Sequence, residues 1–226
     1  GVAKAATKTE IKKAVEDFFN VTVLAVNTQN YEGKAKVLRN RRTVKGQDWK
    51  RAIVTLKKGD KIGLVAPARK IHLKEIGEAL RVFNSWGLEV VCSPHLFGDC
   101  HQFSGTDEER QQDLQQMLDH PEIRAIVCVR GGYGSLRILD HLDWRAFRKN
   151  PKWIAGFSDV TVLHSHLHRK LSTASLHCLM PLNIVAGEAM LPKKKALQSM
   201  KDALFGKTLS YTVPAHPLNR TGEARG

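Results

Sequence analysis

Apolar residues in the first 60 positions follow one helical pattern and two strand patterns. Thr7 and Glu10 have the T-x-x-E spacing of a helix-capping box, and an apolar repeat at i, i+3, i+4, i+7 and i+8 follows them. The members of this repeat are Ile11, Ala14, Val15, Phe18 and Phe19. Strands are predicted over residues 21–27 and 49–56, joined by a polar loop over 28–48. This order predicts a small α+β unit at the front of the chain.

Beyond residue 60, short apolar runs alternate with helical repeats. The runs IGLVAPA, LEVVC, AIVCV and WIAGF predict strands, and STASL at 172–176 predicts a shorter one. Helices are predicted after residue 72, from Thr106 to His120, after Ser135 and over 159–170. Strands that alternate with helices predict a parallel sheet flanked by helices, a Rossmann- or flavodoxin-like α/β domain. We therefore expect two domains, over residues 1–60 and 61–226.

The composition is that of a globular protein. Hydrophobic residues make up 42% of 226 positions, enough to bury a core in one large or two small domains. No apolar run reaches the roughly 18 residues of a membrane span, and no secretory leader pattern opens the chain, so a cytoplasmic protein without membrane contact is predicted. The cysteines show no C-x-x-C spacing, so we predict mostly buried thiols and neither disulfides nor zinc. They are Cys92, Cys100, Cys128 and Cys178.

Positive charge is concentrated at the front. Residues 1–62 hold 15 Lys and Arg against 6 Asp and Glu, within a formal net charge of +14 for the chain. A dense cationic segment suits an RNA phosphate backbone, because each cation displaces condensed counterions and an indole offers a stacking face. A solvated charged hairpin explains the charge equally well. The candidate RNA-binding residues are Lys34, Lys36, Arg39, Arg41, Arg42, Lys45, Trp49, Lys50 and Arg51.

The turn after AIVCV has the sequence Arg130-Gly-Gly-Tyr-Gly-Ser135 and lies at the carboxyl end of a predicted strand, where parallel sheets bind ligands. A dinucleotide fingerprint is excluded because its third glycine would fall at Arg137, and the P-loop lysine is absent. Two interpretations stay open from the spacing alone. One is a structural glycine turn. The other is a strand-to-helix elbow that presents Ser135, with the Leu136 amide available to an oxyanion.

Three of the histidines lie close together in sequence, on the helix predicted over 159–170. His164 and His168 share one face of that helix, whereas His166 points away, and no carboxylate partner is identifiable. We therefore predict neither a metal site nor a cofactor.

The front segments ATKTEIKKAVEDFF, VNTQNYEGKAKVLRNRR and DWKRAIVTLKKGDKI closely resemble the bacterial ribosomal large-subunit protein twenty-three. The resemblance covers residues 2–62. Members of that family bind ribosomal RNA at the rim of the peptide exit tunnel, so the resemblance implies ribosomal RNA as a partner. They also have an opening helix and most of a strand before this point, so we expect an incomplete fragment here.

A second resemblance covers residues 56–226 and rests on LKKGDKIGLVAPARK, VRGGYGSLRILDHLDW and NPKWIAGFSDVTVLHSHLH. These segments look like the amino-terminal domain of the LD-carboxypeptidase family, the muramoyltetrapeptide carboxypeptidases, which includes the microcin-resistance peptidases. Members are cytoplasmic, metal-free serine peptidases that remove the terminal D-alanine from recycled murein tetrapeptides, and they tend to dimerise. One departure is Cys178, since the family usually has a glycine after the histidine found here as His177.

This second resemblance implies a murein-derived peptide as substrate, a homodimer, and Ser135 as the nucleophile with Leu136 as a backbone oxyanion donor. It also implies that the turn at 66–69 lines the pocket. The substrate-binding residues that it implies are Arg130, Gly131, Gly132, Tyr133, Gly134, Ser158 and Asp159.

A serine hydroxyl is a poor nucleophile without a base. In the resembling family that base is a histidine oriented by a glutamate, both in a carboxyl-terminal domain that we expect to be missing here. Such a loss predicts catalysis that is lower by several orders of magnitude. The segment LKKGDKI fits both resemblances, so we interpret the chain as a chimera of two incomplete proteins joined at this shared stretch.

Overall fold

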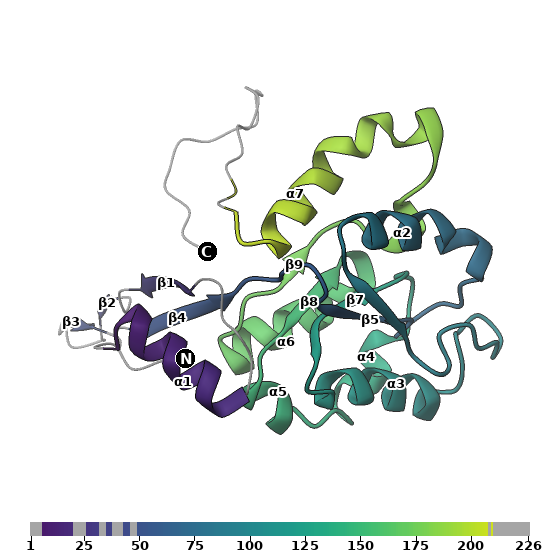
Figure 1. Ribbon diagram of the computed structural model, residues 1–226. Helices are drawn as coiled ribbons and strands as arrows, with labels where there is room; N and C mark the ends of the chain where they lie inside the picture. The colour runs from purple at the N-terminus through teal and green to yellow at the C-terminus, as the bar shows by residue number, and fades with distance from the viewer. Residues whose placement is uncertain are drawn as a thin grey trace, which may run out of the picture.

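The computed structural model describes residues 6–19, 26–31, 35–37, 43–45, 49–207 and 209, with side chains for 6–13, 55–207 and 209. Its main body is a five-stranded sheet in the order β6-β5-β7-β8-β9 (Figure 1). All neighbouring strands are parallel. The predicted α/β class, a parallel sheet flanked by helices, is confirmed. The strands are β5 (Lys61–Val65), β6 (Glu89–Cys92), β7 (Ile123–Cys128), β8 (Trp153–Gly156) and β9 (Leu176–His177).

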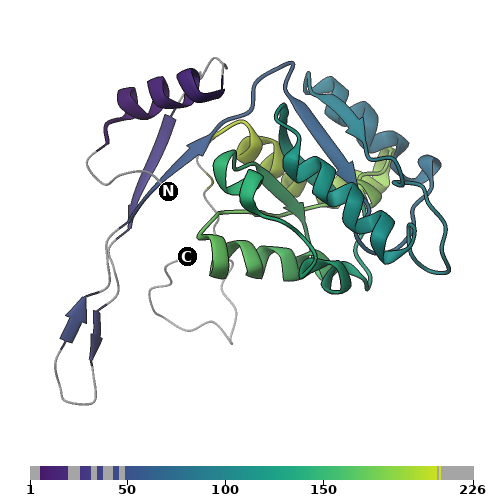
Figure 2. The same cartoon turned by 90° about the horizontal axis from the view of Figure 1, so that it is seen from below.

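Helices cover both faces of this sheet (Figures 1 and 2). Strand side chains point alternately to the two faces, so Leu64 shares one core with Phe83, whereas Val65 shares a second core with Leu114. One face carries α2 (Leu73–Ser85) and α7 (Lys194–Leu204). The other carries α3 (Asp107–Asp119), α4 (Ser135–Leu139), α5 (Arg145–Lys149) and α6 (Thr161–Leu171). Three short 3-10 helices complete this body, η1 (Ser158–Val160), η2 (Pro181–Asn183) and η3 (Gly187–Lys193).

Both predicted capping boxes are confirmed. The Thr106 hydroxyl accepts from the Glu109 amide at 3.2 Å, and the Glu109 carboxylate accepts from the Thr106 amide at 2.8 Å, so α3 begins where the T-x-x-E spacing places it. Thr7 and Glu10 make the same reciprocal pair, at 3.2 and 2.7 Å, before α1 (Lys8–Phe19).

The front strands differ from the prediction. The first observed strand is β1 (Val26–Tyr31), which extends into the predicted loop and pairs antiparallel with β4 (Trp49–Val54). A second antiparallel pair, β2 (Ala35–Val37) with β3 (Thr43–Lys45), also lies within that loop. The expectation of a strandless loop is therefore wrong, because cross-strand pairing overrides the low strand propensity of polar residues. Residues 21–25, where a strand was predicted, lie outside the described residues.

The strand predicted over residues 172–176 is shorter than expected and begins later in the chain, at Leu176. Ser172 adopts the left-handed conformation with φ of 50° and ends α6, and the Thr173 amide donates to the Leu167 carbonyl at 3.0 Å. Because these residues close the helix, only Leu176 and His177 remain to pair with β8.

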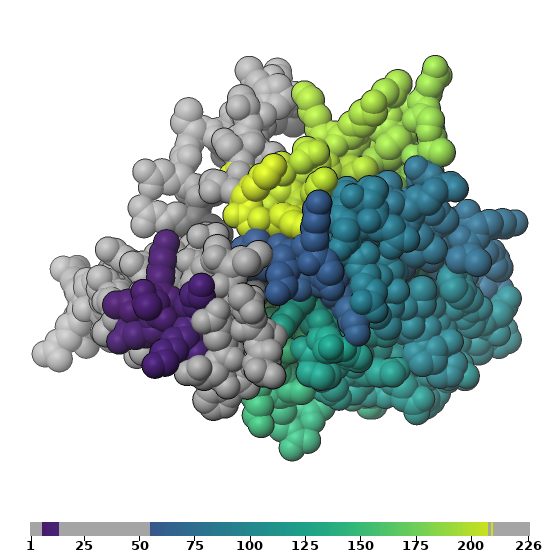
Figure 3. All heavy atoms as spheres, in the orientation of Figure 1, coloured from purple at the N-terminus to yellow at the C-terminus, as the bar shows by residue number. Residues whose placement is uncertain are grey.

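The segment between β4 and β5 packs against the larger unit. Leu56 is 3% exposed and lies in the same core as Met200 and Leu204, and its amide donates to the Leu204 carbonyl at 3.0 Å. The turn that follows is closed by the Gly59 amide, which donates to the Gly87 carbonyl at 2.7 Å. Figure 3 shows α7, in yellow, directly against this blue segment. The strand predicted over 49–56 ends at Val54 because Leu56 is buried in the core of the larger unit. The domain boundary after residue 60 stays a prediction.

The four cysteines are free thiols. The expectation of burial holds for Cys128, whereas Cys92 is exposed at the edge strand β6 and the other two are half-buried. Within the described part of the chain, no helix is both long and apolar enough to cross a bilayer.

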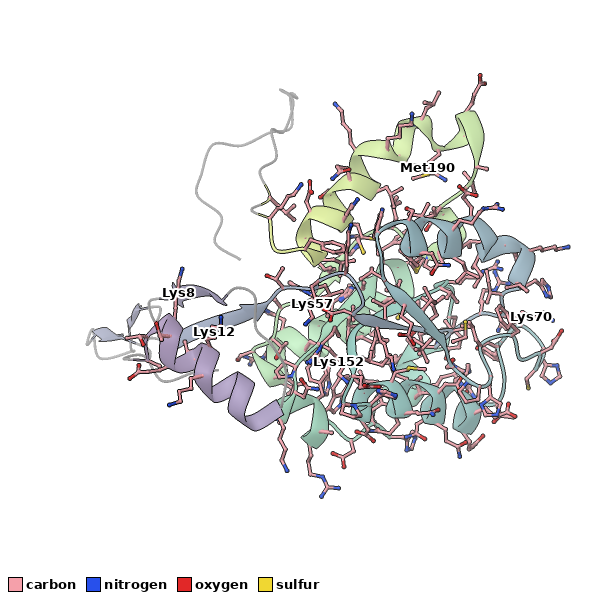
Figure 4. The ribbon with its side chains drawn as sticks, viewed as in Figure 1. Lys8, Lys12, Lys57, Lys70, Lys152 and Met190 are labelled. Carbon is pink, nitrogen blue, oxygen red and sulfur yellow. The ribbon has the colours of Figure 1, made fainter. Side chains whose placement is uncertain are left out.

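A lysine is buried at the start of β8. Lys152 is 5% exposed, and its ammonium donates to the carbonyls of Met117 and His120 at 3.0 and 2.6 Å, at the carboxyl end of α3 (Figure 4). Burial lowers the pKa of Lys152 to about 8, from a usual value of 10.5. Between these two values the unfolded chain holds a proton that the folded chain has released, so the free energy of unfolding should rise with pH.

We expect this rise to be on the order of 2 kcal/mol between pH 8 and 10 relative to Lys152→Met, which lacks the titrating group. Urea unfolding of both proteins at several pH values measures the difference. The same pH dependence in Lys152→Met would contradict the assignment.

Candidate active site

The glycine-rich turn follows β7, between the turns that follow β5 and β8. Gly132 and Gly134 have φ of 120° and 141°, a region that favours glycine. A Cβ at residue 132 would lie 2.3 Å from Cγ of Arg69, and one at residue 134 would lie 3.1 Å from Cα of Ala68. The turn therefore needs glycine both for its backbone conformation and for its contact with the segment after β5.

Ser135 opens α4 directly after this turn. It is 0% exposed, and its Oγ has no hydrogen-bond partner among the described residues. A buried hydroxyl without a partner is uncommon, and this one also lies at a strand-to-helix turn, where a catalytic or ligand-binding group is expected. The Ser135 amide donates to the Asp159 carboxylate at 2.8 Å. This hydrogen bond links the turn at the carboxyl end of β8 to Ser135, the candidate nucleophile.

The turn at residues 158–159 sits against the glycine-rich turn. Ser158 has a φ of 62°, and a Cβ at Gly131 would lie 3.1 Å from its Cβ. The structure thus brings together Ser135, Gly131, Ser158 and Asp159, four residues that the family resemblance implies to share one site.

A buried arginine supports the turn from below. Arg110 of α3 is 1% exposed, and its guanidinium donates to the Pro67 and Gly134 carbonyls at 2.5 and 3.1 Å. It also pairs with Asp107, whose pKa is lowered chiefly by a hydrogen bond from Arg137. Burial lowers the pKa of Arg110 itself. The guanidinium lies 4.7 Å from the centre of the Phe103 ring.

Arg110 is not among the site residues predicted from the sequence. A signal was present, because Arg110 stands one helical turn before Leu114 and two before Met117, on the buried face of α3. A charged residue on an apolar helix face is an expected place for a buried ion pair.

The rim of the site is formed by two paired segments. Residues 66–70 and 100–104 run together, with the Lys70 amide donating to the Gln102 carbonyl at 3.1 Å and the Ser104 amide donating to the Ala68 carbonyl at 3.3 Å. Ser104 Oγ also donates to the Ala66 carbonyl. Lys70 marks this edge of the sheet in Figure 4.

Other predicted residues lie around this rim. Arg130 donates to the Lys70 carbonyl at 3.1 Å, and the Tyr133 side chain is 53% exposed. Leu136 is 57% exposed, and its amide belongs to the first turn of α4, where amides have no partner within the helix. Its oxyanion role stays a prediction. The side chains of all nine candidate RNA-binding residues lie outside the described side chains.

The histidines are placed separately from Ser135 Oγ. His164 Nε2 lies 2.9 Å from the Gly156 carbonyl, and burial lowers the pKa of His164. His95 Nδ1 lies 2.9 Å from the Asp113 carboxylate, a pair that holds the loop after β6 on α3. His166 stacks on Trp144 with ring centres 4.9 Å apart.

Because Ser135 Oγ has no hydrogen-bond partner, none of the described histidines acts on it as a base in this arrangement.

The arrangement is suited to acyl transfer. A serine hydroxyl lies at a strand-to-helix turn, and the amides of the first turn of α4 lie beside it. Within the described residues no group of three metal-binding side chains occurs.

Comparison with known proteins gives two separate matches. Residues 62–178 match the model of the LD-carboxypeptidase N-terminal domain, and residues 1–64 match the model of Ribosomal protein L23. The two matches overlap at residues 62–64, within strand β5.

Individual relatives agree with this division. A probable murein peptide carboxypeptidase of Bacillus subtilis is 32% identical over 173 residues, which cover 76% of this chain and 54% of that protein. The large ribosomal subunit protein uL23 of Opitutus terrae is 56% identical over 64 residues, 28% of this chain and 69% of that protein. The chain spans about half the length of the curated carboxypeptidase relatives it first matches.

Among solved structures, the microcin C7 self-immunity protein MccF, in complex with aspartyl sulfamoyl adenosine, superimposes with a TM-score of 0.64. The match is 23% identical and covers 71% of this chain and 49% of that one. This likeness shows a shared fold.

Proposed function

The chain belongs to the LD-carboxypeptidase family through residues 62–178 and to the ribosomal protein L23 family through residues 1–64, and from this we propose that its larger unit is the nucleophile-bearing part of a serine peptidase. Its substrate is a murein-derived tetrapeptide that loses its terminal D-alanine. The observation that carries the proposal is Ser135, whose buried and unpartnered Oγ lies at the start of α4. The cytoplasmic location and the homodimer implied by the family resemblance belong to the same proposal.

In the proposed reaction Ser135 Oγ attacks the carbonyl carbon before the terminal D-alanine. The hydroxyl proton passes to a base, and the oxyanion is held by the Leu136 amide. The base then protonates the leaving nitrogen as the C–N bond breaks, and water hydrolyses the resulting ester. The Ser135 amide is engaged by Asp159, so this carboxylate positions the turn.

The base in this reaction lies outside the described residues, because Ser135 Oγ has no partner among them. We therefore expect slow turnover that an added base accelerates. The test is release of D-alanine from a murein tetrapeptide, followed by mass spectrometry with increasing imidazole. Release by the wild-type chain should rise with imidazole, and release by Ser135→Ala should not. Equal release by both proteins at every imidazole concentration would contradict the proposal.

We further propose that the front unit binds RNA through the basic segment between Lys34 and Arg51. The 56% identity to a uL23 protein favours this over a merely solvated hairpin. Each lysine or arginine that neutralises a phosphate contributes to the salt dependence of binding.

Replacing Arg39, Arg41 and Arg42 with alanine should weaken binding of a ribosomal RNA fragment and reduce the slope of log K against log salt by about 2–3. Fluorescence anisotropy at several salt concentrations measures this slope. A matched control removes the same charge from α7, by replacing Lys194, Lys195 and Lys201 with alanine. Equal losses in the two triple variants would show a general charge effect and contradict a specific front interface.

A further inference from the structure

Four arginines lie around the turn that carries Ser135, and three of them have partners. Arg110 and Arg137 share the Asp107 carboxylate. Arg130 donates to the Lys70 carbonyl at 3.1 Å and lies 3.8 Å from the Glu75 carboxylate. The fourth, Arg69, is exposed, and its guanidinium makes no hydrogen bond or ion pair with any residue that the structure describes. A cation is therefore available at the rim of the site.

The aliphatic part of the Arg69 side chain, here called its stem, is held in place by packing, although its guanidinium has no partner among the described residues. Its backbone forms a bridge with Phe103, within the paired segments 66–70 and 100–104. Its Cγ and Cδ lie over Gly132, where an added Cβ would come within 2.3 and 2.4 Å of them. The glycine at position 132 thus makes room for this stem. The aliphatic part of the Arg69 side chain therefore packs against the turn that ends at Ser135.

The neighbouring cation is already engaged. Lys70 Nζ lies 2.6 Å from the Asp99 carboxylate. Arg69 therefore differs from the cations around it in having both a fixed stem and an unpaired charge. A guanidinium in this state matches the geometry of a carboxylate, which it can bind through two parallel hydrogen bonds.

We propose that Arg69 binds the terminal carboxylate of the peptide whose scissile carbonyl faces Ser135. This inference rests on the proposed function and adds the group that makes the site select chain ends. In a carboxypeptidase substrate the terminal carboxylate belongs to the residue just after the scissile bond, so its counter-charge must lie beside the nucleophile. Arg69 meets this requirement because its stem crosses Gly132, three residues before Ser135.

The test compares two ligands that differ in one group, a murein tetrapeptide with a free terminal carboxylate and the same peptide as its terminal amide. Calorimetric titration into the wild-type chain should show at least about tenfold tighter binding of the acid. In Arg69→Met the two peptides should bind equally, and Arg69→Lys should keep part of the preference. The control is Arg169→Met, which removes an exposed arginine of α6 that also has no described partner. This variant should keep the full preference.

An acid preference that survives in Arg69→Met would overturn the inference, as would a wild-type chain that binds both peptides equally or neither. A fluorophosphonate, which carries no carboxylate, separates this result from the nucleophile proposal. Arg69→Met should still be labelled at Ser135. Loss of the acid preference with labelling retained supports both proposals, whereas a wild-type acid preference without any labelling of Ser135 would remove the nucleophile proposal and leave carboxylate binding in place.

Discussion

Replacing Arg110 with methionine is expected to lower the free energy of unfolding by about 3–5 kcal/mol. The side chain is 1% exposed, and its guanidinium serves the Pro67 and Gly134 carbonyls and the Asp107 carboxylate. Methionine fills much of the same volume but donates no hydrogen bond. The two carbonyls would lose their donor in a buried setting, and each such loss costs about 1–3 kcal/mol.

Urea unfolding measures this loss, and the chain offers a matched control. Arg81 makes the same i,i+3 type of ion pair, with Glu78, but its side chain is 74% exposed. Arg81→Met should therefore change the free energy of unfolding by less than about 0.5 kcal/mol. If Arg110→Met does not fold, the milder Arg110→Lys should still fold with a clear loss. Similar small losses in Arg110→Met and Arg81→Met would show that Arg110 does not support the turn.

The second large effect is expected in Ser135→Ala. This change should abolish covalent reaction at the site, since it removes the attacking oxygen. It should also leave the fold intact and raise the free energy of unfolding, by about 1 kcal/mol, because the buried hydroxyl it removes has no hydrogen-bond partner. Gain of stability with loss of reactivity is typical of a residue kept for function.

Ser104 provides the comparison for stability. It is also buried, at 1% exposed, but its hydroxyl donates to the Ala66 carbonyl. Ser104→Ala should therefore lower the free energy of unfolding by about 1 kcal/mol, opposite in sign to Ser135→Ala. Thermal and urea unfolding of the three proteins provide the values. A loss of stability in Ser135→Ala as large as that in Ser104→Ala would indicate a structural serine.

Much of the larger unit could be predicted from the sequence because its signals are local. The apolar runs of β5 and β7 and the capping box at Thr106 each specify an element without knowledge of the rest of the chain. The turn that ends at Ser135 could be placed for the same reason, since a glycine-rich segment after a buried strand falls at the carboxyl edge of a parallel sheet.

The features that escaped prediction depend on contacts distant in sequence. Leu56 looked like the end of a front strand, but its core is completed by Leu204, nearly 150 residues later. Arg110 gains its role from the carbonyls of Pro67 and Gly134, on two other turns. The free guanidinium of Arg69 is visible only once the partners of the other arginines are known.

The packing of Leu56 also bears on how two families meet in one chain. The two family matches overlap at residues 62–64, and Ile62 and Leu64 of this overlap lie in the same core as Leu56. The junction therefore falls where the larger unit needs apolar residues. This agrees with the interpretation of the chain as a chimera joined at residues 56–62.

We have proposed that the turn after β7 presents Ser135 as a nucleophile. Its most direct test is reaction of the folded chain with a fluorophosphonate, in which Oγ displaces fluoride from phosphorus, followed by peptide mapping. With imidazole added as the base, we expect labelling of Ser135 at least about tenfold faster than of the exposed Ser165, and none at position 135 in Ser135→Ala. A Ser135 that reacts no faster than Ser165 would contradict it.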